Sequence, residues 1–166
     1  MWFDSRMNRT IATIALSSTA VLLLGACGDS GASTSAASCS DPIAIENADF
    51  AATASSVPLP DDAILVGGRY TAISGEPGMF GAAIDICDPA VTTADDLRPI
   101  ATAYAKALKA SPLSGQISKV WVESYQVDGD EVINDVKVKD SDFQMHLWNG
   151  KPSEEFELTR WEVISG

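Results

Sequence analysis

Two kinds of side chain in this sequence are suited to covalent or acid–base chemistry, namely three cysteine thiols and a single imidazole. A catalytic serine or cysteine needs a base such as histidine to activate it and a carboxylate to orient that base. The one histidine, His146, is remote from every cysteine in the sequence, and no Gly-x-Ser-x-Gly motif is present. One histidine also excludes a multi-histidine metal site. The sequence therefore predicts a protein that is not an enzyme and that uses no cofactor.

Acidic side chains gather around a predicted turn at residues 128–135, where a hard cation such as calcium is conceivable. The calcium-binding loop pattern is absent, and Asp128-Gly129 is fully explained as a hairpin signal. The glycine pair at residues 67–68 lacks the Lys-Ser/Thr that a phosphate-binding loop carries after its glycines. We therefore expect neither a metal ion nor a nucleotide.

Cys27, the first of the three cysteines, follows a segment typical of export signals. Arg6 and Arg9 precede 14 uncharged residues, Ile11 to Leu24, which are too few to span a bilayer but fit the apolar region of a signal peptide. The residues Leu24-Gly25-Ala26-Cys27 resemble the lipobox of bacterial lipoproteins. The resemblance implies that signal peptidase II cleaves before Cys27 and that its thiol carries a diacylglycerol, with palmitate as an attached acyl chain. A plain secretory signal is the alternative.

This interpretation divides the chain into three parts. Residues 1–26 are the lipoprotein signal peptide, residues 27–38 are the lipidated cysteine with a flexible tether, and residues 39–166 form a single α+β domain. The tether is made of small and polar residues and spans about 18 Å. The lipid would hold the protein on the extracytoplasmic face of the cell membrane.

The two remaining cysteines, Cys39 and Cys87, are expected to form a disulfide, as paired cysteines in exported domains usually do. A bridge across such a loop stabilises the domain by about 4 kcal/mol through loop entropy. Two free buried thiols are the alternative.

The charge of the chain limits its partners. The formal net charge is −12, from 23 acidic and 11 basic side chains, and removal of Asp4, Arg6 and Arg9 with the signal peptide leaves 22 against 9, a net charge of −13. A phosphate backbone repels such a surface, so nucleic acid is excluded as a partner. Anionic lipid repels it too, so the covalent lipid must provide the attachment to the membrane.

The clearest predicted element is a helix over residues 97–110. Pro99 would interrupt a helix that began much earlier, so we expect Asp96 as the N-cap. Apolar residues repeat at helical spacing and predict one buried stripe, made of Leu97, Ile100, Ala101, Tyr104 and Leu108.

The other segments predict strands, because apolar residues alternate between turn signals. The expected strands are 63–73, 79–87, 117–127, 131–138, 143–148 and 156–163. The first of these is either one strand with a bulge at the glycine pair or two short strands. The predicted fold class is α+β, one main helix packed on a curved antiparallel sheet that comprises an N-terminal hairpin and a four-stranded C-terminal meander. This element order resembles cystatin-like folds, in which a sheet wraps a single helix, and the resemblance implies a fold and no function.

The strand expected at residues 143–148 supplies the candidate partner surface. Period-2 alternation places one set of side chains against the helix and the other set outside. The inner set, expected in the core together with Val132, Val136 and Val138, is Phe143, Met145 and Leu147. The outer set, where an exposed tryptophan marks a possible binding surface, is Gln144, His146 and Trp148.

These observations favour a membrane-anchored cell-envelope lipoprotein that acts as a non-enzymatic binding module for a protein or cell-wall partner. One alternative is an inhibitor or immunity protein that meets a basic partner through an acidic sheet surface. Another is an envelope hydrolase whose site has no recognisable motif. A basic partner with salt-sensitive binding would favour the first alternative, and turnover of an envelope polymer the second.

Overall fold

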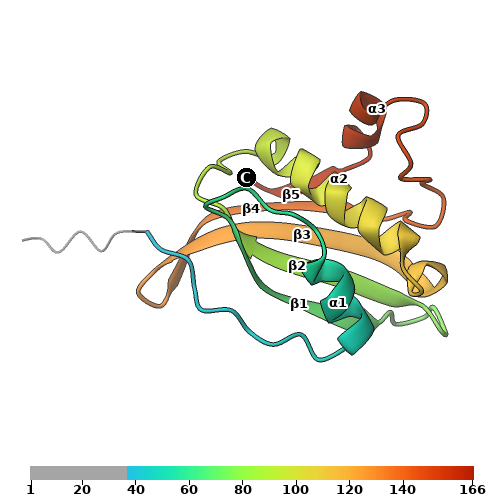
Figure 1. Ribbon diagram of the computed structural model, residues 1–166, viewed down its shortest axis with the longest axis horizontal. Helices are drawn as coiled ribbons and strands as arrows, with labels where there is room; N and C mark the ends of the chain where they lie inside the picture. Colours follow the sequence, from blue (N-terminus) through green and yellow to red (C-terminus); the bar gives the residue numbers. More distant parts are fainter. Residues whose placement is uncertain (1–36) are drawn as a thin grey trace, which may run out of the picture. The chain divides into compact units, whose positions relative to one another are not determined.

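Five strands form one sheet in the computed structural model, which describes residues 37–166 (Figure 1). The strands follow chain order across the sheet, and only β2 and β3 run parallel to each other. The strands are β1 (Ile64–Ala72), β2 (Phe80–Cys87), β3 (Ile117–Asp128), β4 (Glu131–Asp140) and β5 (Glu162–Ser165). The helices are α1 (Ala48–Ser55), α2 (Ala94–Ala110) and α3 (Glu154–Leu158), with a 3₁₀ turn at Ser114–Gln116.

The sheet and helices confirm an α+β fold, but the expectation of a wholly antiparallel sheet is wrong. The chain leaves β2 at Cys87 and enters β3 at Ile117, and α2 lies within this connection. Two parallel neighbours need a long crossover of this kind, whereas a short turn joins antiparallel ones. The C-terminal meander consequently has three strands, β3 to β5, and not four.

The core lies between the sheet and the helices. The predicted stripe of α2 is confirmed, with Leu97, Ala101, Tyr104 and Leu108 buried and Ile100 packed at the edge of the core. Alternate residues of β3 and β4, among them Val122 and Val138, are buried beneath it, while the residues between them are half-buried on the other face. Figure 1 shows α2 lying along the sheet. The other two helices, α1 and α3, both contact α2.

The helix α2 begins three residues earlier than expected. Thr93 is the N-cap, and its hydroxyl accepts a hydrogen bond from the Asp96 N–H at 3.4 Å. Asp96 returns the interaction, because its carboxylate accepts from the Thr93 N–H at 2.9 Å. This capping box, with acidic residues in the first turn, offsets the hydrogen bond that Pro99 cannot make inside the helix.

The first hairpin follows the prediction, and the second departs from it at one residue. Strand β1 is continuous, and its register with β2 shifts between Leu65 and Gly67, so the expected bulge exists but lies at Val66, immediately before the glycine pair. Strands β3 and β4 are joined at Gly129, whose φ of 62° suits glycine. The expected burial of Val132 is wrong, because a register shift between Ser124 and Gln126 separates it from the buried valines.

The predicted strand 143–148 does not exist, and only the end of the predicted strand 156–163 belongs to a strand, β5. Residues 143–148 form turns and extended loop, and residues 154–158 form α3. Trp148 is buried while Met145 and Leu147 are exposed, so the expected inner and outer sets are wrong for these three residues. Phe143 is buried as expected.

The Cys39–Cys87 disulfide is confirmed and ties the start of the domain to the end of β2. Beside it, Ser38 forms an isolated antiparallel bridge with Val127 near the end of β3. The predicted signal peptide, Cys27 and most of the tether lie outside the described residues. Among residues 37–166, no helix is long and apolar enough to cross a membrane.

Candidate functional site

A cavity of about 200 Å³ lies between the loop that follows β4 and the helix α3. We call it the 145–160 pocket. Its lining comes from one continuous stretch of chain, so its shape depends on how that stretch is held against the sheet and α2. The lining residues are Met145, His146, Leu147, Trp148, Lys151, Pro152, Phe156, Glu157 and Arg160.

The carboxylate of Asp140 organises the loop of residues 141–150. Asp140 continues the buried alternation of β4 beyond Val138 and is fully buried. Its Oδ1 accepts from the Asp142 N–H at 2.9 Å and lies 2.9 Å from His146 Nδ1, and its Oδ2 accepts from the Trp148 indole N–H at 3.0 Å. A carboxylate only accepts hydrogen bonds, so His146 Nδ1 carries the hydrogen. One buried acidic group thereby fixes the loop backbone and two aromatic side chains.

Trp148 forms the buried end of the pocket. Its indole is 4% exposed, and its ring centroid lies 5.0 Å from that of Trp161 and 5.9 Å from the His146 ring, which meets it edge-on. Trp161 is held in turn by its own indole N–H, which donates to Thr102 Oγ1 of α2 at 2.9 Å. The backbone of Trp148 has a φ of 49°, a conformation that costs a bulky residue about 1–2 kcal/mol. The packing and the bond to Asp140 must outweigh that strain.

The C-terminal part of α2 anchors the other side of the loop. Lys109 Nζ donates to the Phe143 carbonyl at 2.8 Å and lies over the Phe143 ring, 4.6 Å from its centroid. Partial burial lowers the pKa of Lys109, and the nearby Asp140 carboxylate offsets part of that effect. Gln144 donates from its amide to the Ser114 carbonyl at 2.6 Å, so its side chain fastens the loop to the segment after α2.

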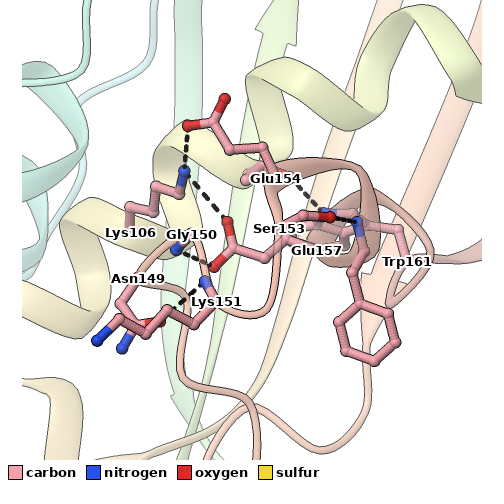
Figure 2. A network of polar contacts seen from close by, with 10 residues as sticks. Lys106, Asn149, Gly150, Lys151, Ser153, Glu154, Glu157 and Trp161 are labelled. Atoms are coloured by element: carbon pink, nitrogen blue, oxygen red, sulfur yellow. Dashed lines mark hydrogen bonds and ion pairs between the residues drawn. The ribbon is translucent and has the colours of Figure 1, made fainter.

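A second buried carboxylate, that of Glu157, holds the other wall of the pocket (Figure 2). Its Oε1 accepts from the Gly150 N–H at 2.7 Å, and its Oε2 pairs with Lys106 Nζ of α2 at 3.1 Å. Figure 2 shows Lys106 between Glu157 and Glu154, which lies 3.4 Å from the ammonium. Burial lowers the pKa of Lys106, but the carboxylates of Glu157 and Glu154 together have the larger effect, so the pKa of Lys106 is raised. The ion pair joins α3 to α2, and the hydrogen bond from Gly150 joins α3 to the 141–150 loop.

The rim of the pocket is apolar and exposed. Met145 is 79% exposed, Leu147 62% and Phe156 40%, so three of the eight large hydrophobic side chains that the described residues expose surround this one cavity. Exposed apolar groups that gather around a cavity are typical of binding sites, whereas single exposed ones are common everywhere. The Arg160 guanidinium lies over the Phe156 ring, 4.2 Å from its centroid.

The structure divides the three residues predicted as a partner surface. His146 and Trp148 line the 145–160 pocket, Trp148 from a buried position, whereas Gln144 is not among the lining residues and fastens the loop elsewhere. The exposed apolar part of the site is formed instead by Met145 and Leu147, which the alternation pattern assigned to the core.

Two residues that position the site were not singled out from the sequence. Asp140 falls between the predicted strands 131–138 and 143–148, although period-2 alternation continues from Val136 and Val138 to it and places it on the buried face. Glu157 was assigned to a strand. Ser153 followed by Glu154 and Glu155 is a helix N-terminus signal that could have located α3, and the Ser153 hydroxyl indeed accepts from the Phe156 N–H.

Within residues 37–166 no group of three or more His, Cys, Asp or Glu side chains is placed to hold a metal ion. Comparison with protein-family models, with curated proteins and with solved structures gave no match.

Proposed function

We propose that this protein is a lipid-anchored lipoprotein of the cell envelope whose folded domain binds a partner protein through the 145–160 pocket. The observation that carries the proposal is the gathering of Met145, Leu147 and Phe156, exposed and apolar, around one cavity. Their surroundings are rigidly held, because Asp140 and Glu157 bind the loop and α3 from beneath. A preformed apolar site of this kind binds without a large ordering penalty.

The anchoring part of the proposal rests on the lipobox-like residues that end in Cys27 and on the polar tether after them. The disulfide between Cys39 and Cys87 supports an exported domain, because such bonds persist in oxidising compartments. The tether enters the domain next to that bridge, at Ser38. The lipid would keep the pocket within a short distance of the membrane, on its extracytoplasmic side.

Binding is favoured over catalysis because the hydrogen bonds of Asp140 have a structural explanation. In a hydrolase, a buried carboxylate that orients a histidine serves to tune that base. Here the same carboxylate also holds the Asp142 backbone and the Trp148 indole, which is what a loop anchor does. We therefore assign the contact between Asp140 and His146 to the construction of the pocket.

An inhibitor that uses an acidic sheet surface receives less support. On the face of the sheet away from the helices, Glu123 pairs with Lys137 at 2.5 Å, and Asp85 lies 3.9 Å from Arg69. Asp135 beside Glu123 forms no ion pair, but the basic side chains on this face offset much of the negative charge, so the face offers little attraction to a basic partner. The pocket therefore remains the better candidate surface.

The proposal is tested by using the full-length chain as bait in detergent-solubilised cell envelope. The double variant Met145→Ser/Leu147→Ser should lose a partner protein that the unaltered chain retains, with an unchanged unfolding temperature because both side chains are exposed. The matched control is Val132→Ser/Val163→Ser, which also removes two exposed apolar side chains but none that lines the pocket. Retention by the first variant, or equal loss in the control, would contradict the proposal.

A further inference from the structure

Four basic groups of the described domain form no ion pair with a described carboxylate, and two of these four lie at the same cavity. Of the nine lysines and arginines in residues 37–166, five form ion pairs with carboxylates of the same segment. Lys151 and Arg160 form none with any described residue, and both line the 145–160 pocket. The expected mature chain has 22 acidic and 9 basic side chains, a net charge of −13. Two cations without an ion pair at one apolar cavity are therefore unexpected.

The acidic residue in the lining does not cancel these cations. The carboxylate of Glu157 is buried and already shared between Lys106 Nζ, at 3.1 Å, and the Gly150 N–H, at 2.7 Å. Lys151 and Arg160 are both exposed at the rim. Glu154 and Glu155 are close in the chain but do not line the pocket, and Glu154 also pairs with Lys106. Among the lining residues, the charges that remain without an ion pair are therefore positive.

The arrangement of Arg160 suits a carboxylate in particular. Its guanidinium lies over the Phe156 ring, 4.2 Å from the ring centroid. The guanidinium forms no ion pair with a described carboxylate, so its N–H donors can bind a carboxylate of a ligand in a bidentate way. The contact with the ring also restricts the side chain before a ligand arrives, so less conformational freedom is lost on binding.

The size of the cavity sets the size of the apolar group. Sites for drug-sized ligands occupy about 300–1,000 Å³, and this cavity is smaller, at about 200 Å³. It suits one bulky side chain, which Met145, Leu147 and Trp148 would contact. Such an anchor in a pocket is the usual centre of a protein interface.

From these observations, and resting on the proposed function above, we propose that the pocket binds an acidic segment of the partner protein. One bulky apolar side chain of that segment fills the cavity, and carboxylates of its neighbours pair with Lys151 and Arg160. The same site disfavours a basic segment, because the two unpaired cations repel it.

The test measures the affinity of the full-length chain in detergent micelles for three fluorescent peptides of equal length. Their central residues are Glu-Phe-Glu, Lys-Phe-Lys and Glu-Gly-Glu. The first should bind best, and changing either Lys151 or Arg160 to alanine should weaken it about three- to tenfold, as expected for a partly exposed charged contact. The double variant Lys151→Glu/Arg160→Glu should prefer the lysine peptide.

Lys139→Glu is the matched control, because Lys139 also lacks an ion pair with any described residue but lies over Trp121, outside the pocket lining. It should leave the order of the peptides unchanged. Equal binding of the glutamate and lysine peptides, no reversal by the double variant, or no binding of any peptide would overturn the inference. Charge-independent binding that Met145→Ser/Leu147→Ser abolishes would overturn this inference while leaving the proposed function intact. The proposed function itself stands or falls with the envelope bait experiment.

Discussion

Replacing Asp140 with alanine removes the acceptor that three hydrogen bonds of the 141–150 loop share. The indole N–H of the buried Trp148 then has no acceptor, and a buried donor without a partner costs about 1–3 kcal/mol. The donors of Asp142 and His146 are only partly buried and can turn to water, so each loses about 0.5–1.5 kcal/mol. Together these losses predict a destabilisation of about 2–6 kcal/mol.

Asp142→Ala is the matched control, since it removes the same kind of side chain two residues further along the same loop. The Asp142 side chain is exposed, so this variant should change stability by less than about 0.5 kcal/mol. Denaturant unfolding of the purified protein, followed by tryptophan fluorescence, measures both variants. If Asp140→Ala costs no more than Asp142→Ala, the reasoning that one buried carboxylate holds the loop is wrong.

Four further predictions concern other parts of the chain. Trp148→Ala should destabilise the protein by about 3–5 kcal/mol in denaturant unfolding, whereas the exposed Leu147→Ala should cost less than about 0.5 kcal/mol; similar costs would contradict the observed loop. Thr93→Ala should cost about 1 kcal/mol through the lost cap, and no change in the unfolding midpoint would argue against the capping box. Burial raises the pKa of Tyr104, so the unfolded state loses that proton first and stability should fall as the pH rises above about 10. Tyr104→Phe, which removes a hydroxyl without a partner among the described residues, should reduce this alkaline loss in unfolding curves measured across pH, and an identical profile would refute the assignment. Cys27→Ala should abolish partitioning into the detergent phase, and a processed variant that stays with the membrane would disprove the anchor.

The parts of the fold that were predictable are those in which local pattern and packing agree. The stripe of α2 repeats at helical spacing and is buried as expected, including Leu97 and Tyr104. The pairing of Cys39 with Cys87 followed from the number of cysteines and from the predicted export signal. Turn residues located the first hairpin and the bulge in β1. Each of these features is decided within a short stretch of chain or by simple counting.

The start of α2 was mispredicted because two local effects compete there. The penalty of Pro99 inside a helix argued for a late start at Asp96. The capping box between Thr93 and Asp96, together with the acidic first turn, favours the earlier start that the structure shows. Pro99 is exposed, so water can donate a hydrogen bond to the backbone carbonyl that would otherwise accept from an N–H at position 99.

The 141–150 loop could not be predicted from its own residues. Alternating apolar and polar residues from Phe143 to Trp148 imitate a strand. The interactions that decide its shape come from outside the segment, from Asp140 at the end of β4 and from Lys109 on α2. The alternation of β4 places Asp140 on the buried face, but no pattern in the sequence shows which donors its carboxylate binds or that Lys109 reaches the loop.

The central claim is that the 145–160 pocket is the surface that a partner contacts in the cell. Photo-crosslinking in intact cells tests it most directly, with a photoreactive amino acid at position 147 in one variant and at position 132 in another. Leu147 and Val132 are similarly exposed, at 62% and 54%, but only Leu147 lines the pocket. We predict a discrete crosslinked protein from position 147 and none from position 132. Equal crosslinking from both positions, or crosslinking from position 132 alone, would contradict the claim.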